Sequence, residues 1–66
     1  MSLYDYQYSL QIAAQDPPFY AIIMAALRKA DSTNYERLKA VFPHVERELR
    51  TRWDAPGGRL PHEVTK

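Results

Sequence analysis

The 66-residue sequence predicts an all-α fold, a compact bundle of three to four short helices with a non-regular C-terminal tail. Apolar residues recur at helical spacing through most of the chain, and prolines and cap-forming residues divide it into short segments. Beyond residue 15 no segment alternates as a strand would, so a β-sheet has no second member. A chain this short forms a single small domain, residues 1–66, with a small core.

The first predicted helix covers residues 5–15, and its pattern fits two conformations. Apolar and polar residues alternate as in a half-buried strand, the apolar positions being Tyr4, Tyr6, Tyr8, Leu10 and Ile12. A helical stripe is also present, formed by Leu3, Tyr6, Leu10, Ala13 and Ala14. Ser2 and Asp5 are placed for a capping box. We favour the helix because a strand would need a second strand to pair with. Only an edge-to-edge dimer of two chains would supply one.

Asp16-Pro17-Pro18 separates the first helix from a second one, predicted over residues 17–30. Proline disfavours helical conformation in the residue before it, so the first helix should end near residue 15. Pro17 suits the first position of a helix, and Asp16 is expected to cap it. A broad apolar face marks this segment as the central helix of the bundle: Phe19, Ile22, Ile23, Ala26 and Leu27.

A third helix is predicted over residues 33–41, where Thr33 and Glu36 fit a capping box. Pro43 removes a helical hydrogen bond, so the chain should restart as a fourth helix over residues 43–53. The apolar positions of these two helices continue in phase: Tyr35, Leu38, Phe42, Val45, Leu49 and Trp53. The pairs Glu46–Arg50 and Glu48–Arg52 are expected on the outer face of the fourth helix.

Gly57-Gly58 predicts a turn that ends the last helix. The tail, residues 59–66, is expected to lie along the surface or to fray, with Leu60 as its anchor.

Residues suited to catalysis or metal binding do not cluster. Cysteine is absent, and His44 and His62 have no further ligand at metal-binding spacing. Glu46 and Glu48 are two residues apart on a helix, so they point in different directions. We therefore expect a protein that is not an enzyme, with no metal site, no cofactor and no small-molecule substrate. The longest apolar run, residues 21–27, is far shorter than the about 20 residues of a membrane span.

Charge is unevenly distributed along the chain, although the net charge is +1. Residues 1–27 carry two aspartates and no cation, whereas residues 28–52 have a balance of +3. Four cations could form a basic stripe for phosphate contacts, but we favour a solvated face in which glutamates accompany them: Arg37, Lys39, Arg47 and Arg50. The five tyrosines exceed what so small a core can bury, so we expect one or two N-terminal tyrosines to face a protein partner.

Two runs, Tyr8–Ala14 and Asp16–Ala26, resemble a family of very short proteins from phages and mobile elements. Further matching positions are Arg28, Ala30-Asp31, Asn34, Leu38, Phe42-Pro43, Glu48-Leu49, Arg52 and Ala55–Gly58. The resemblance covers roughly residues 6–61, and its most specific part is the sequence DPPFYAIIMAA. One member of this family type is an anti-CRISPR protein that acts on the type I-C system.

The resemblance implies inhibition by binding, without catalysis, in the cytoplasm of the infected bacterium. The partner would be a protein subunit of the CRISPR surveillance complex (Cascade), whose binding of target DNA would be blocked. The inhibitor would act as a monomer and would not itself contact nucleic acid. Acidic side chains could imitate phosphates, for which Asp5, Asp16 and Asp31 are candidates. An aromatic patch with Tyr4 and Tyr6 could instead block a protein surface, including the docking site of the nuclease-helicase.

An alternative class is a small nucleic-acid-binding phage regulator. It would contact phosphates through the four cations Arg37, Lys39, Arg47 and Arg50. Salt-dependent binding of bare DNA would separate this class from the inhibitor.

Overall fold

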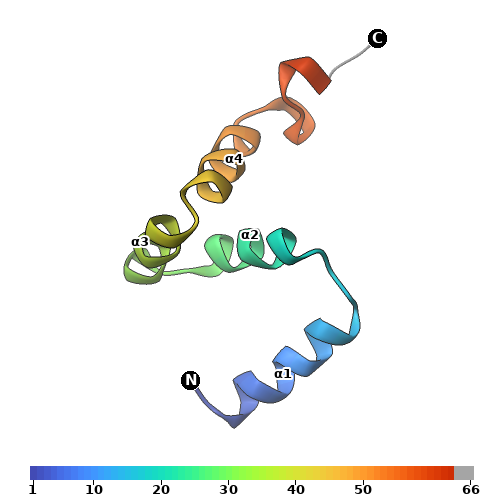
Figure 1. Ribbon diagram of the computed structural model, residues 1–66, viewed down its shortest axis with the longest axis vertical. Coiled ribbons are helices and arrows are strands. Elements are labelled where there is room, and N and C mark those ends of the chain that lie inside the picture. Colours follow the sequence, from blue (N-terminus) through green and yellow to red (C-terminus); the bar gives the residue numbers. More distant parts are fainter. Residues whose placement is uncertain (64–66) are drawn as a thin grey trace.

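The computed structural model describes residues 1–63 and confirms the all-α prediction (Figure 1). Four helices follow one another: α1 (Leu3–Ala14), α2 (Phe19–Lys29), α3 (Ser32–Val41) and α4 (Pro43–Trp53). Two single 3₁₀ turns complete the described chain, η1 (Pro56–Gly58) and η2 (Pro61–Glu63). This part of the chain contains no strand, so the alternation at its N-terminus does not form a sheet.

α1 begins as the capping pattern predicts, but α2 does not. The Asp5 amide donates to Ser2 Oγ at 3.3 Å, and the Ser2 hydroxyl donates back to the Asp5 carboxylate at 3.3 Å. Asp16 was expected to cap a helix starting at residue 17, but α2 starts at Phe19 with Pro18 as its N-cap and no side-chain cap. Asp16 instead has a left-handed backbone (φ 51°), and Pro18 stays extended (ψ 144°), which delays the helix by two residues.

α3 and α4 are joined directly at Phe42, whose backbone is not helical (φ −123°, ψ 62°). Asp31 caps α3 by accepting a hydrogen bond from the Asn34 amide at 2.8 Å, in place of the expected Thr33 cap. α4 has the predicted bounds because Pro43 fits the first position of a helix. The glycines do not end α4 as predicted, because the helix stops at Trp53 with Asp54 as its C-cap. Gly57 (φ 61°) and Gly58 (φ 71°) instead turn the chain with left-handed backbones in η1.

α2, α3 and α4 pack against one another, whereas α1 packs against no other described element. Figure 1 shows α1 and α2 diverging from the linker between them like the arms of a V. Within residues 1–63 the buried apolar side chains are Leu27 and Leu49, 2% and 4% exposed. Around them, the Phe19 and Phe42 rings meet edge to face at 6.1 Å, so α2 and the α3–α4 junction share a small core.

Glu46 is a correction to the expected outer face of α4, because its side chain is buried. The Tyr35 hydroxyl donates to Glu46 Oε2 at 2.6 Å, and Arg50 Nε donates to the same oxygen at 3.1 Å. Hydrogen bonds from Tyr35 and then Arg50 hold the pKa of the Glu46 carboxyl below its usual value. The buried charge is thus satisfied, and it ties α3 to α4.

The segment after α4 is held by Arg52. Its guanidinium donates to both carboxylate oxygens of Glu63 at 2.7 Å and to the Gly58 carbonyl at 2.8 Å. The amide of Leu60, which is half-buried, donates to Glu63 Oε1 at 3.1 Å. Residues 59–63 therefore lie along the end of α4, as expected for a tail that follows the surface. Residues 64–66, also part of the predicted tail, lie outside the described chain.

Replacing Leu27 by Ala should lower the free energy of unfolding by about 2–5 kcal/mol, because a fully buried leucine loses its packing and leaves a cavity. Urea denaturation followed by circular dichroism measures this change. Ile22→Ala on the same helix is the control, since Ile22 is 37% exposed and should cost clearly less. Equal losses for both variants would contradict the core described above.

Acid should release the C-terminal segment. The Arg52 hydrogen bonds lower the pKa of Glu63 from 4.5 to about 2. Because the pKa of this carboxyl is lower in the docked segment than in the released one, the charged form stabilises docking. This stabilisation is complete above about pH 4.5 and is lost as the pH falls toward 2. NMR titration of the Glu63 side-chain carboxyl should show the low midpoint, and Arg52→Gln should return it toward 4.5. A midpoint near 4.5 in the unaltered chain would contradict the contact.

Candidate protein-interaction surface

α1 leaves its large apolar side chains exposed to solvent. Every residue from Met1 to Asp16 is exposed, and the large apolar residues Leu3 and Tyr6 keep 69% and 63% of their surface accessible. An amphipathic helix in a compact monomer normally buries its apolar stripe against the rest of the fold. An exposed apolar helix of this kind is typical of a surface that binds another molecule.

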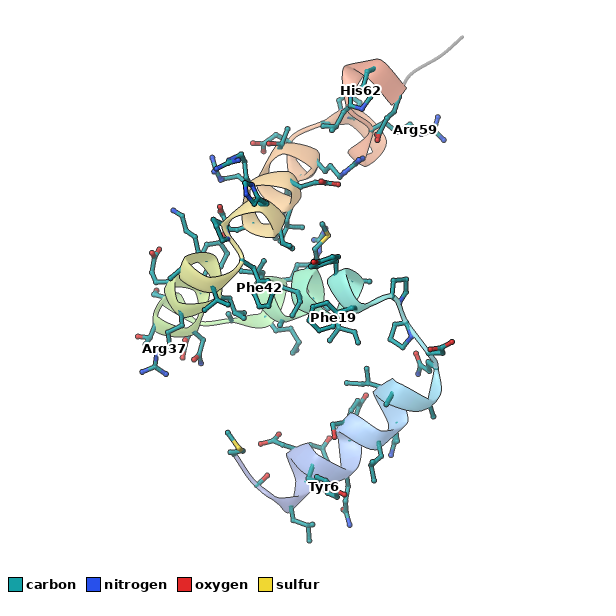
Figure 2. All side chains as sticks on the ribbon, in the orientation of Figure 1. Tyr6, Phe19, Arg37, Phe42, Arg59 and His62 are labelled. Atoms are coloured by element: carbon teal, nitrogen blue, oxygen red, sulfur yellow. The ribbon has the colours of Figure 1, made fainter. Side chains whose placement is uncertain are left out.

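The apolar residues of α1 lie on two sides of the helix. Leu3, Tyr6 and Leu10 follow the i, i+3, i+7 spacing of one face, called the outer stripe here. Tyr4, Tyr8 and Ile12 follow an i, i+4, i+8 spacing on a different side, and the Tyr4 and Tyr8 rings lie 5.9 Å apart. Tyr4 and Tyr6 are two residues apart, so they point to different sides. Figure 2 labels Tyr6 on α1.

A groove runs between α1 and α2. Near its open end it is lined by Tyr4, Asp5, Tyr8, Ser9, Ile12 and Lys29. Closer to the linker its walls are Ile12, Gln15 and Pro17 on one side and, on α2, Ala21, Ile22, Ala25, Ala26 and Lys29. The α1 wall thus carries aromatic and branched side chains, whereas the α2 wall is rich in alanine. One anion and one cation, Asp5 and Lys29, lie at the open end.

The structure separates the residues expected to contact a partner. Tyr4 and Asp5 line the groove, whereas Tyr6 belongs to the outer stripe. Asp16 lies in the linker beyond the C-terminal end of α1, whereas Asp5 is in the first turn of this helix. The Asp31 carboxylate accepts the capping hydrogen bond of α3. The three aspartates therefore do not form one acidic patch.

Most residues that line the groove were not among the predicted site residues, and Tyr8, Ile12 and Lys29 are examples. The i, i+4, i+8 spacing of Tyr4, Tyr8 and Ile12 was the available signal for the α1 wall. The α2 wall had no such signal, because its position depends on the linker.

The cations of the alternative nucleic-acid site do not form a continuous stripe. Arg37 and Lys39 lie two residues apart on α3 and so point to different sides. Arg50 binds Glu46, Arg47 Nη1 lies 3.4 Å from His44 Nδ1, and Arg37 extends from α3 (Figure 2). The solvated face favoured from the sequence is not formed as expected either, because Glu46, one of its glutamates, is buried.

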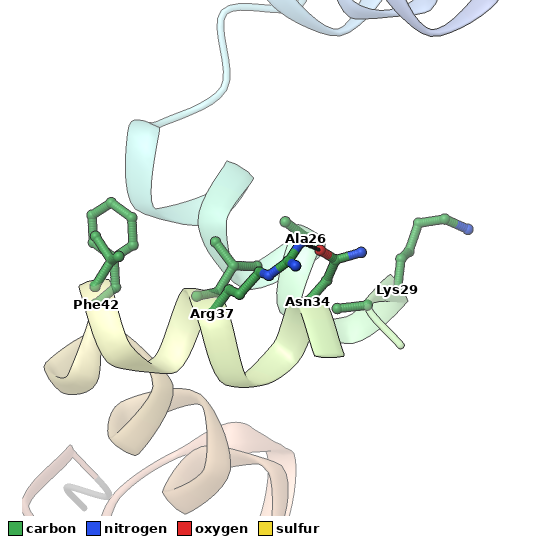
Figure 3. A pocket seen from close by; sticks show the side chains of 8 residues that line it. Ala26, Lys29, Asn34, Arg37 and Phe42 are labelled. Carbon is green, nitrogen blue, oxygen red and sulfur yellow. Dashed lines mark hydrogen bonds between the residues drawn. The ribbon is translucent and has the colours of Figure 1, made fainter. Parts of the chain in front are cut away.

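A hollow of about 490 Å³ lies between α2 and α3 (Figure 3). It is lined by apolar side chains together with Lys29, Asn34 and Arg37, and its lining includes no carboxylate, histidine or hydroxyl. Among residues 1–63, no group of three or more His, Cys, Asp or Glu residues is placed to hold a metal ion. No helix in this part of the chain has the length and apolar character to cross a membrane.

No protein-family model, no curated protein and no solved structure matches the chain. The two surfaces that stand out are the outer stripe of α1 and the groove between α1 and α2.

We expect the purified chain to show no measurable retention of short duplex DNA in about 50 mM salt, because its cations are dispersed and partly paired. Fluorescence anisotropy with a labelled duplex measures this. Binding that weakens by a large factor between about 50 and 200 mM salt, and that is lost in Arg47→Glu, would contradict this expectation and favour the nucleic-acid-binding regulator.

Proposed function

We propose that this protein is a non-catalytic inhibitor that binds a protein subunit of the type I-C surveillance complex and blocks the binding of target DNA. The observation that carries the binding part of this proposal is the exposure of the outer stripe on α1, with Tyr6 63% and Leu10 54% accessible. The identity of the partner comes from the resemblance of the runs Tyr8–Ala14 and Asp16–Ala26 to the phage and mobile-element family.

The outer stripe has the geometry of a helix that docks in a groove of another protein. Such helices present apolar anchors at i, i+3 and i+7, which is the spacing of Leu3, Tyr6 and Leu10. Tyrosine is a frequent hot-spot residue because it adds a large contact area and a polar hydroxyl. Burying each anchor on the partner would contribute about 1.5–3 kcal/mol before the costs of association.

A steric block accounts for the inhibition better than imitation of DNA. A phosphate mimic needs several carboxylates at regular spacing, and Asp5 and Asp16 are at opposite ends of α1, while Asp31 is engaged as a helix cap. The net charge of +1 also disfavours a chain that lies along a basic DNA channel. A single helix placed over a protein surface needs neither property.

Tyr6→Ala should weaken binding to purified type I-C Cascade at least tenfold, because it removes the central anchor of the outer stripe. Biolayer interferometry with immobilised complex measures the affinity. Gln11→Ala, also exposed on α1 but away from the outer stripe, is the control and should bind like the unaltered chain. The Asp5→Lys, Asp16→Lys double variant tests the phosphate mimic, and a larger loss there than in Tyr6→Ala would favour imitation of DNA.

A plaque assay provides the functional readout. Expression of the chain in a strain with active type I-C immunity should restore phage growth, and Tyr6→Ala should reduce this effect. Unchanged immunity at verified expression, together with no binding to any Cascade subunit, would refute the proposed function.

A further inference from the structure

We propose that the hollow between α2 and α3 receives a short segment of a protein partner in which an apolar side chain lies next to carboxylates. This inference does not depend on the inhibitor function, because it concerns a face formed by α2 and α3, whereas the outer stripe lies on α1. Three features support it: the distribution of polar and apolar groups in the hollow, the two cations that line it, and its open side.

The hollow is polar at one end and apolar at the other. Figure 3 shows Lys29 and Phe42 at opposite ends, with Asn34 and Arg37 between them. Apolar side chains form the rest of the wall: Ala26, Ala30, Leu38 and Val41. The volume of about 490 Å³ is within the range of ligand pockets, about 300–1,000 Å³. An occupant therefore needs an apolar group for the Phe42 end and a polar group for the Lys29 end.

The polar groups of the hollow are donors that suit a carboxylate. Lys29 and Arg37 carry positive charges, and within residues 1–63 neither forms an ion pair. Arg37 Nη1 donates to Asn34 Oδ1 at 3.5 Å, and the amide nitrogen of Asn34 adds further donors to the same row. Because no carboxylate lines the hollow, an anionic occupant would supply the missing counter-charge and accept charge-assisted hydrogen bonds.

The acidic residues of α3 lie on a different side of this helix. Asp31 and Glu36 line a second hollow, which contains neither cation. Arg37 and Val41 are four residues apart and share one side, whereas Glu36 is adjacent to Arg37 in sequence and points elsewhere. The hollow between α2 and α3 is thus positively charged without a neighbouring anion on its wall, which favours an acidic occupant over a basic one.

The open side of the hollow indicates a segment of a protein rather than a free small molecule. Val41 is 69% exposed, and Lys29 and Arg37 are exposed as well. Ligand pockets bury about 70–90% of the surface of a small ligand, and a hollow with so exposed a lining leaves much of its occupant in water. A side chain presented by a second protein is covered on its outer side by that protein, so that the apolar group is removed from water on binding.

A peptide with a central phenylalanine between two pairs of aspartates tests the proposal, because it offers carboxylates on either side of the ring. NMR spectra of the ¹⁵N-labelled chain should show saturable shifts at the Asn34 and Val41 amides, with a dissociation constant of about 1 mM or lower. Lys29→Gln and Arg37→Gln should each weaken binding at least threefold. Lys39→Gln is the matched control: it also removes a lysine from the last turn of a helix, does not line the hollow, and should leave the affinity unchanged. The three replaced side chains are exposed, so circular dichroism should show unchanged helicity.

Changes in the peptide test its two parts separately. Replacing its aspartates by asparagine, or its phenylalanine by serine, should each weaken binding at least threefold, because each change removes one of the two contacts. Free phenylpropionate should bind more weakly than the peptide, and equal or tighter binding would assign the hollow to a small anionic ligand and overturn the proposal.

Three further results would overturn it. The first is the absence of saturable shifts at about 10 mM peptide. The second is equal weakening by Lys39→Gln and Lys29→Gln, which would show an effect of net charge alone. The third is an altered peptide, without carboxylates or without the ring, that binds as tightly as the original.

Discussion

The linker at Asp16-Pro17-Pro18 is the constraint on which the arrangement of the chain depends. Proline disfavours the right-handed helical region for Asp16, and the two pyrrolidine rings restrict the φ torsions that follow. α1 therefore ends before the linker, α2 starts after it, and the two helices diverge rather than pack (Figure 1). A helix with tyrosines on several sides is held away from the rest of the fold, and this separation creates both the outer stripe and the groove.

The other three helices hold together with a very small core, so polar contacts have an unusual share in their stability. Among the described residues, Leu27 and Leu49 are the buried apolar side chains, and Glu46 is buried with hydrogen bonds from Tyr35 and Arg50. The Arg28 guanidinium covers the Trp53 ring at 4.3 Å and adds a contact between α2 and α4. These contacts are directional, which fixes the relative positions of α2, α3 and α4 without a large apolar interior.

The sequence was sufficient to predict those features of the fold that a single residue determines locally. Pro43 determines where α4 starts, and Gly57 supplies the left-handed turn that follows this helix. Predictions from local patterns were wrong where a tertiary contact or a second proline determines the structure. Glu46 lies four residues after Phe42 and therefore on the same side as Phe42. The charge of Glu46 predicted an exposed position, but its carboxylate is buried and accepts a hydrogen bond from the Tyr35 hydroxyl of α3.

The candidate surfaces were predictable to a similar extent. The excess of tyrosine indicated a protein contact, and helical spacing places Tyr6 and Tyr4 on different sides of α1. That Lys29 faces Tyr4, and the alanines of α2 face Ile12, follows from the linker torsions, which no local pattern specifies. The scattered positions of the three aspartates are a property of the three-dimensional arrangement for the same reason.

The central claim is that α1 makes its apolar contacts outside its own chain. Nuclear Overhauser spectroscopy of the purified chain tests it most directly. The account expects the ring of Tyr6 and the methyl groups of Leu10 to show no cross-peaks to side chains of α2, α3 or α4, because α1 packs against none of these helices. Cross-peaks from Tyr6 or Leu10 to side chains of these helices would contradict it.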